Sequence, residues 1–257
     1  MADSRRRRMS GSERREQLLD VGRSLFAEKG LDGTSVEEIA AKAGVSKPVV
    51  YEHFAGKEGL YAVVVDREMD KLLVMVTAAL TVEADYRRKL ELAALALLEY
   101  IEESTAGFRI LVRDSHGGTG RGSFASLLSE IAGQVEHLLA KELDHHSYDE
   151  KTAPMYAQML VGMIALTGQW WLDTRKPRRE DVAAHVVNLA WNGLSALEPK
   201  PSLDPRRRAK ERERATARAE KAVEKAERAA ARAERALEKA RRKVPASLHE
   251  EITPVDA

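Results

Sequence analysis

The sequence predicts an all-α protein, and three observations support this prediction. Alanine, leucine and valine are abundant, whereas aromatic residues make up only 5% of the chain, a composition that favours helices over strands. Apolar residues recur at steps of three and four along most of the chain, as on one face of a helix. No stretch shows the sustained period-two alternation of a half-buried strand. We therefore expect an N-terminal domain of three helices with a helix-turn-helix, a larger helical bundle, and a long charged C-terminal helix.

The first expected helix begins at residue 12 and ends at Glu28-Lys29-Gly30. Its apolar residues share one face: Leu18, Leu19, Val21, Leu25 and Phe26.

The second expected helix begins near Val36. The hydroxyls of Thr34 and Ser35 can cap the free N–H groups at its start, and a glutamate three residues after each completes a capping box in either register. Ile39, Ala40 and Ala43 form its apolar face, and the following glycine tolerates the left-handed conformation that ends a helix.

The third expected helix runs from Lys47 to about Phe54. Ser46 is its N-cap, and Pro48 lies in the first turn, where its missing N–H costs nothing. Val50 and Phe54 can pack back against the second helix. That packing leaves Lys47 and three further side chains on the outer face or flank: Val49, Tyr51 and His53.

These outward residue types suit a DNA surface. A lysine can donate to phosphates or to guanine, tyrosine and histidine can donate to phosphates, and a valine can contact the methyl group of thymine. Lys57 begins the next helix, whose free N–H groups can bind a phosphate. The alternative is a small helical hairpin in an all-α core, with Tyr51 and Phe54 as packing residues. The candidate DNA contacts are Thr34, Ser35, Ser46, Lys47, Val49, Tyr51, His53 and Lys57.

Over residues 12–60 the chain resembles the TetR family of transcriptional regulators. The resemblance rests on matches at fixed spacing: Glu28-Lys29-Gly30, Thr34, Ala43-Gly44-Val45-Ser46-Lys47, Tyr51, Phe54, Lys57 and Leu60. It implies a dimeric protein, most often a repressor, that binds a palindromic operator in successive major grooves. It also implies DNA contacts by Thr34, Lys47, Tyr51, His53 and Lys57. Pro48 departs from the small residue often found at its position, which puts direct hydrogen-bond readout there in doubt.

Charge is unevenly distributed although the net charge is only +1. Residues 1–60 carry 11 basic and 10 acidic side chains, residues 61–205 carry 15 and 21, and residues 206–243 carry 16 and 7. Arg5 to Arg8 lie in a flexible arm suited to a phosphate backbone or minor groove, or alternatively in a solubilising tail. No apolar run follows them, so we expect no secretory signal. The absence of cysteine excludes disulfides and thiol catalysis, and we expect a cytoplasmic, nucleoid-associated protein.

Further helices are expected along the middle of the chain: a long one containing Leu60 to Leu80, then about 86–101, a short one near 108–111, and 123–143, 152–172 and 179–196. The segment 152–172 contains no charged side chain. Polar residues interrupt it and no second such segment exists, so burial against a partner chain is favoured over a membrane span. With 179–196 it predicts a two-fold four-helix interface, and the family dimerises in that manner.

The family resemblance also implies a small-molecule cavity in the helical domain. The candidate residues are Tyr100, Phe108, Arg109, Arg113, Met155, Met159, Met163 and Trp170, with the arginines available to an anionic group. The segment from Gly162 to Asp173 is similar to actinobacterial lipid-metabolism regulators that bind acyl-CoA, which implies a hydrophobic or acyl-CoA-like effector. Methionine and aromatic residues at helical spacing are more often ordinary core residues, which is the alternative for each of them.

No catalytic arrangement, cofactor or metal site is expected. The glycine-rich segment 116–120 lacks the lysine and strand of a phosphate-binding loop. His145 and His146 diverge on a helix, so their metal ligation is disfavoured.

After a proline-rich linker, residues 206–243 form a charged helix with alanines at steps of three and four. Alanine buries little area, so we favour a lone or weakly paired helix over a coiled coil. Nonspecific adhesion to DNA and a solubilising role are the other interpretations, and an architectural DNA-coating protein is the alternative function.

The predicted organisation is 1–11 basic disordered arm, 12–57 helix-turn-helix domain, 58–198 ligand-binding and dimerisation domain, 199–205 linker, 206–243 charged helix and 244–257 disordered tail.

Overall fold

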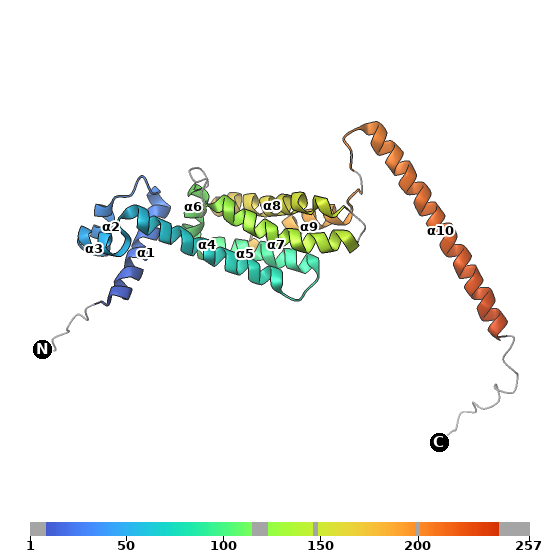
Figure 1. Cartoon of the computed structure of the whole chain (residues 1–257), viewed down its shortest axis with the longest axis horizontal. Helices are drawn as coiled ribbons and strands as arrows, with labels where there is room; N and C mark the ends of the chain where they lie inside the picture. The colour runs from blue at the N-terminus through green and yellow to red at the C-terminus, as the bar shows by residue number, and fades with distance from the viewer. Residues whose placement is uncertain (1–8, 115–122, 146–148, 199–200, 242–257) are drawn as a thin grey trace, which may run out of the picture. The chain divides into compact units, whose positions relative to one another are not determined.

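A computed structural model describes residues 9–114, 123–145, 149–198 and 201–241, and these residues contain helices and no strand (Figure 1). The expected arm at Arg5 to Arg8, the glycine-rich segment 116–120, His146 and the tail 244–257 lie outside the described residues. No described helix has the length and apolarity needed to cross a membrane. The chain divides into two compact units, Met1–Ala196 and Leu197–Ala257.

The N-terminal end of the first unit is built from α1 (Gly11–Lys29), α2 (Val36–Ala43) and α3 (Lys47–Phe54). Helix α1 begins one residue before the predicted start because Ser10 forms a complete capping box with Glu13. The backbone N–H of Glu13 donates to the Ser10 hydroxyl at 3.2 Å, and the Ser10 N–H donates to the Glu13 carboxylate at 2.7 Å. Two of the unpaired N–H groups of this helix start are thereby satisfied.

Helix α4 (Lys57–Thr81) runs from this end into the helical bundle, and it packs on both α1 and α5 (Figure 1). Its buried residues recur at helical spacing from Leu60 to Leu80. By their contacts the described residues up to 196 form one compact unit. The physical reason is that α4 is common to both parts and that α1 also packs against α6.

The bundle contains α5 (Tyr86–Glu103), α6 (Thr105–Asp114), α7 (Phe124–His145), the short 3-10 helix η1 (Glu150–Thr152), α8 (Ala153–Thr174) and α9 (Arg179–Ser195). Helices α7 and α8 pack together, and α5 packs against α4, α8 and α9. Three buried rings form its aromatic centre. Tyr100 and Phe108 lie with centroids 6.3 Å apart, and Phe108 and Phe124 lie 5.8 Å apart, both pairs edge to face, an arrangement that aromatic quadrupoles favour.

A buried carboxylate joins four helices of this unit. Glu68 of α4 is 7% exposed. It accepts from Nε of Arg23 on α1 at 2.5 Å and from the hydroxyl of Tyr100 on α5 at 2.6 Å. Burial, followed by the adjacent carboxylate charge, raises the pKa of Tyr100, so its hydroxyl stays a proton donor. Gly107 of α6 lies against the pair, and a Cβ there would come within 1.9 Å of the Glu68 carboxylate.

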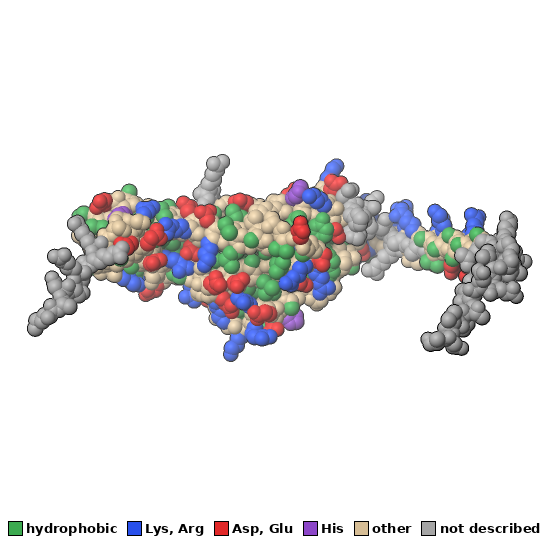
Figure 2. Space-filling model, turned by 90° about the horizontal axis from the view of Figure 1, so that it is seen from below, with side chains coloured by type: hydrophobic (Ala, Val, Ile, Leu, Met, Phe, Trp, Pro, Cys, Tyr) green, Lys and Arg blue, Asp and Glu red, His purple; other side chains and the backbone are tan. Residues whose placement is uncertain are grey.

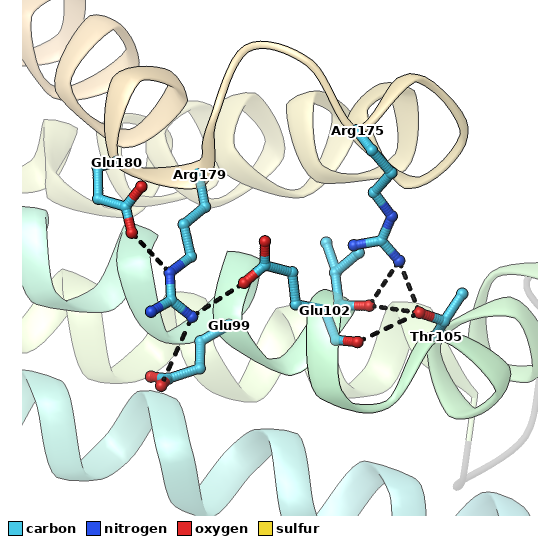
Figure 3. Close-up of polar contacts among 7 residues, drawn as sticks. Glu99, Glu102, Thr105, Arg175, Arg179 and Glu180 are labelled. Carbon is cyan, nitrogen blue, oxygen red and sulfur yellow. Dashed lines mark hydrogen bonds and ion pairs between the residues drawn. The ribbon is translucent and has the colours of Figure 1, made fainter.

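A second polar junction fixes the turn between α8 and α9 (Figure 3). Arg175 ends α8 in the left-handed conformation, and its Nη2 donates to the Ile101 carbonyl at 2.8 Å and to the Thr105 hydroxyl at 2.6 Å. Burial lowers the pKa of Arg175. Arg179, at the start of α9, pairs with Glu102 of α5 at 3.0 Å. The turn is therefore tied to the corner between α5 and α6, where a cation also suits the helix C-terminus.

The second unit contains one described helix, α10 (Pro205–Arg241). It starts at the third proline of the predicted linker, because proline is compatible with a first helical turn. Its described side chains are exposed throughout.

Replacement of Gly107 by alanine should destabilise the protein, because the new Cβ displaces a carboxylate that Arg23 and Tyr100 hold in place. We expect the free energy of unfolding in urea to fall by about 1–3 kcal/mol, the usual range for overpacking. The matched control is Gly133→Ala in α7, where a Cβ meets nothing within 4 Å and the better helix propensity raises stability by up to about 1 kcal/mol. Equal effects of the two substitutions would contradict the packing argument.

Candidate nucleic-acid interface

The two short helices α2 and α3 are joined by a tight turn that the sequence predicts correctly. Ser35 is the cap of α2, and its hydroxyl accepts from the Glu38 N–H at 3.1 Å. Gly44 ends the helix with φ +65°, the left-handed conformation that favours glycine. The Val45 N–H then donates to the Ala40 carbonyl at 3.0 Å. Between the two possible capping registers, the structure uses Ser35.

Helix α3 is held from behind by its own apolar residues and by α1. Val50 is fully buried and Phe54 nearly so. Arg15 of α1 donates to the His53 carbonyl at 2.8 Å, and its guanidinium lies 4.2 Å from the centre of the Phe54 ring. Gln17 of α1 donates to the Ala43 carbonyl at 3.1 Å, at the end of α2. Because α1 contacts the ends of both helices, it sets the position of α3.

The opposite side of α3 carries the predicted contact residues. Lys47 and Tyr51 are exposed, and Val49 and His53 are half-buried on the flanks. Ser46 is exposed, and its hydroxyl makes no capping bond. Lys47 forms an ion pair with Glu37 at the start of α2. Its hydrogen bond lowers the pKa of the Glu37 carboxyl.

A shallow hollow of about 360 Å³ opens beside Tyr51 and Lys57. It lies where α2 and α4 both begin, and the cap residue of α4, Gly56, supplies no side-chain capping bond. Free N–H groups at two helix starts and a lysine make a site suited to a phosphate oxygen. Acidic side chains share the rim: Asp32, Glu37 and Glu58. Lys57 donates to the Leu31 carbonyl at 3.0 Å.

The expectation for the Thr34 side chain is corrected. Thr34 is only 1% exposed, and its hydroxyl donates to the Gly30 carbonyl at 2.8 Å. It holds the connection between α1 and α2, because Gly30 ends α1 and leaves its carbonyl in need of a donor. A side chain buried in this way does not face a phosphate.

The predicted ligand-pocket residues do not lie together. Tyr100 and Phe108 are fully buried, and Met163 is half-buried. Arg109 is exposed and lies 3.9 Å from the Asp173 carboxylate. Arg113 donates to the Ala27 carbonyl at 3.1 Å, at the end of α1.

Three residues proposed for the pocket are corrected because they lie on the outer surface of α8: Met155, Met159 and Trp170. Arg113 ties α6 to α1 through the Ala27 carbonyl, and its contact with a ligand stays a prediction.

Sequence reasoning missed the buried group Glu68, Arg23 and Gly107. One signal could have found it. Glu68 lies four residues after Val64 and four before Leu72, so a lone charge interrupts the apolar face of α4. Buried charges are normally paired. The described residues contain no group of three or more histidine, aspartate or glutamate side chains placed to hold a metal ion.

A helix-turn-helix with an exposed basic and aromatic face, set on a helical bundle, defines a DNA-binding protein of the helix-turn-helix class. Two family comparisons identify it further. The family described as bacterial regulatory proteins, tetR family, matches residues 18–64. The family described as tetracyclin repressor-like, C-terminal domain, matches residues 75–204. The chain belongs to the TetR family and is a DNA-binding transcriptional regulator.

Individual relatives agree with this assignment. The HTH-type transcriptional activator FasR of Mycolicibacterium smegmatis is 32% identical over 193 residues, which cover 73% of this chain and 86% of the relative. The crystal structure of a TetR-like transcriptional regulator from Rhodococcus sp. RHA1 has a TM-score of 0.63 at 25% identity, and the match covers 74% of this chain and 100% of that one. The fatty acid degradation regulator FadR of Bacillus halodurans shares the fold, with a TM-score of 0.59 at 18% identity over 70% and 96% of the two chains.

Replacement of Lys47 by alanine should weaken DNA binding and lower the dependence of log Kd on log salt by about 1, the loss expected for one phosphate contact. Binding of an operator obtained by selection from random DNA is to be measured by fluorescence anisotropy over a range of salt concentrations. Lys141→Ala, which removes the same charge from the exposed surface of α7, is the control and should leave both quantities unchanged. If the two variants behave alike, the outer face of α3 is not the DNA surface.

Proposed function

We propose that this protein is a ligand-responsive regulator that binds a palindromic operator as a two-fold dimer. The single observation that carries the proposal is the pairing of an exposed recognition face on α3 with a separate exposed apolar stripe on α8. The first suits DNA, and the second suits a second copy of the chain. A dimer with two recognition helices about 34–36 Å apart fits successive major grooves on one side of the duplex.

The apolar stripe of α8 supports the dimer. Its four large side chains recur at steps of four, seven and four residues and are between 47 and 65% exposed: Met155, Met159, Leu166 and Trp170. Gly162 lies on the same stripe, where a Cβ would meet nothing within 4 Å. Leu189 adds an exposed apolar side chain on α9. Large apolar side chains that share one exposed helix face mark an interaction surface, and a two-fold axis lets one stripe meet itself.

Helix α1 supports a connection between an effector and the DNA end. Arg15 near its start holds α3, Arg23 in its middle pairs with Glu68, and its last carbonyls accept from Arg113 of α6. An effector that displaces Tyr100 or α6 changes these contacts. It therefore biases α1, and with it the position of α3, because packed interiors shift between discrete arrangements.

The effector proposed is a long acyl chain, as in acyl-CoA. Support comes from the apolar interior around Tyr100 and Phe108 and from the sequence similarity at Gly162 to Asp173. A relative of the same fold, at 18% identity, is named a fatty acid degradation regulator. Oleoyl-CoA is the probe, with acetyl-CoA and free coenzyme A as controls. Oleoyl-CoA alone should weaken operator binding, and an equal effect of acetyl-CoA would contradict recognition of the chain.

The experiment that tests the proposal is selection of bound duplexes from random DNA. The expected product is a palindrome whose half-sites lie about one helical turn apart. Products without two-fold symmetry would overturn the dimeric operator. Transcription from a promoter that overlaps the selected site should fall when the protein is added, because a dimer across two grooves covers DNA that polymerase needs.

Introduction of a charge into the α8 stripe should separate the dimer. Leu166→Glu places a carboxylate in the centre of the proposed interface, where an unpaired buried charge is costly. The matched control is Val74→Glu on α4, an apolar residue that is also about two-thirds exposed. By light scattering at equal concentration, the first variant should be monomeric and the second dimeric. A dimeric Leu166→Glu protein would show that α8 is not the interface.

Replacement of Glu68 by glutamine should uncouple effector from DNA. The amide can still accept from Tyr100, but the charge that holds Arg23 is gone. We expect the operator affinity of this variant without effector to stay within about threefold of that of the unchanged protein. The factor by which oleoyl-CoA weakens operator binding should fall toward one, because the coupling free energy is carried by such contacts. An unchanged factor would place the coupling elsewhere. Circular dichroism checks that the variant is folded.

A further inference from the structure

The charges of α10 are sorted by sign onto different faces of the helix. One column contains only cations, at alternating steps of four and three: Arg214, Arg218, Lys221, Lys225, Arg228, Arg232 and Arg235. A second column contains only glutamates, at steps of seven: Glu213, Glu220, Glu227 and Glu234. All of these side chains are exposed. Figure 2 shows Lys and Arg side chains gathered along one edge of α10.

Between the two charged columns lies an apolar stripe with the same repeat. Its alanines stand at steps of four and three: Ala222, Ala226, Ala229, Ala233 and Ala236. Val223 lies beside them and is 57% exposed. In a seven-residue repeat the innermost cations then stand about 75° to one side of the centre of the stripe and the glutamates about 130° to the other, beyond Val223. A strict seven-residue period keeps one seam facing a partner over several turns, whereas an isolated helix has no need of it.

Within an isolated helix the glutamate column has little support, because Glu220, Glu227 and Glu234 have no cation three or four residues away. Glu227 has Glu224 three residues before it and alanines three and four residues after it, and Lys221 has Lys225 four residues after it. Like charges at these spacings destabilise a helix. Among the ion pairs within described α10, Glu224 with Arg228 at 2.5 Å shows the favourable spacing. A partner that presents the opposite sign on each flank would supply the cations that the helix itself does not place beside this column.

We propose that α10 pairs with α10 of a second copy of the chain, parallel and in register, along the alanine stripe. Two-fold rotation about an axis along a parallel pair brings the cationic flank of one helix beside the glutamate flank of the other. In an antiparallel pair the cations would face cations and the glutamates would face glutamates. Charge complementarity therefore selects both the partner and the direction.

A second copy explains more of the pattern than DNA does. Phosphates would complement the cationic column, but such contacts would make no use of the glutamate column or of the alanine stripe, which repeat equally strictly. The weakness of an alanine interface is offset where the two chains are already joined. The two-fold dimer proposed above, on which this step rests, would tether the helices at an effective concentration on the order of millimolar.

Disulfide formation tests the pairing, because the chain has no cysteine of its own. Single variants of the full-length protein, Ala222→Cys and Ala236→Cys, place a thiol at two heights on the stripe. Ala231→Cys places one on the opposite face. Under mild oxidation without DNA, both stripe variants should form linked dimers about tenfold faster than Ala231→Cys, since a disulfide requires Cα atoms within about 7 Å. Linkage at one stripe position only would indicate an antiparallel pair, and equal rates at all three would indicate no pairing. Either result overturns the proposal.

Charge substitution tests the complementarity. The first set adds Glu220→Lys and Glu227→Lys to the Ala236→Cys protein, which makes both flanks cationic. Disulfide linkage should then be no faster than in the Ala231→Cys protein. The control set adds the same four charges to the outer face of the helix by Ala217→Lys, Glu224→Lys and Ala231→Lys. It should leave the faster disulfide linkage of the Ala236→Cys protein unchanged. Co-expression of the first variant with a chain carrying Lys225→Glu and Arg232→Glu should restore linkage between the unlike chains. Equal effects of the two lysine sets, or no restoration, would overturn charge-directed pairing.

Operator affinity of the same variants is measured separately. Failure of α10 to pair with operator binding intact overturns only the present inference. If the two stripe variants still form linked dimers about tenfold faster than Ala231→Cys when each also carries Leu166→Glu, α10 pairs without that tether.

Discussion

The carboxylate of Glu68 is the constraint on which the first unit depends. A buried charge is tolerated only when its partners are in place, and those partners come from α1 and α5. Gly107 brings α6 so close that a Cβ has no room. Four helices therefore meet at one point whose geometry leaves little freedom. An apolar contact in the same position would allow the helices to slide, whereas hydrogen bonds of 2.5 and 2.6 Å fix both distance and direction. The position of the DNA-binding end relative to the bundle follows from this group together with the shared helix α4.

The sequence predicts the helix-turn-helix to the residue, because the signals that define it are local. Ser35 and Gly44 set the ends of α2, and Ser46 precedes α3, whose observed bounds Lys47–Phe54 are those predicted. Which of two adjacent hydroxyls caps α2 is not a local matter, since Thr34 is taken by the Gly30 carbonyl of the preceding helix. Local signals thus define the element, and tertiary contacts decide the individual side chain.

In the bundle, the sequence does not predict which apolar and charged side chains face the interior. The uncharged run in α8 contains both buried residues, such as Ala157 and Trp171, and exposed ones, such as Leu166. Apolarity alone does not distinguish the interior of a chain from a surface available to a partner. Met155 and Met159 are of a residue type that often lines ligand pockets, but both lie on an exposed face of α8. Arg113 likewise has the charge to meet an anion, yet the chain supplies its partners as backbone carbonyls of Phe26 and Ala27. Contacts between residues about 86 apart in sequence leave no trace in any local spacing.

The attachments of α1 have an evolutionary consequence. Its bonds reach α3 at the His53 carbonyl and the Phe54 ring, α2 at the Ala43 carbonyl, and α4 at Glu68. None of them involves the outward side chains of Lys47, Val49 or Tyr51. Those positions can accumulate substitutions that direct the protein to another DNA sequence, while the contacts of α1 with the other side of α3 are kept. After gene duplication, one copy can acquire a new DNA target and keep its effector, or acquire a new effector and keep its target. The reason is that DNA recognition and the contacts with α1 use opposite sides of α3.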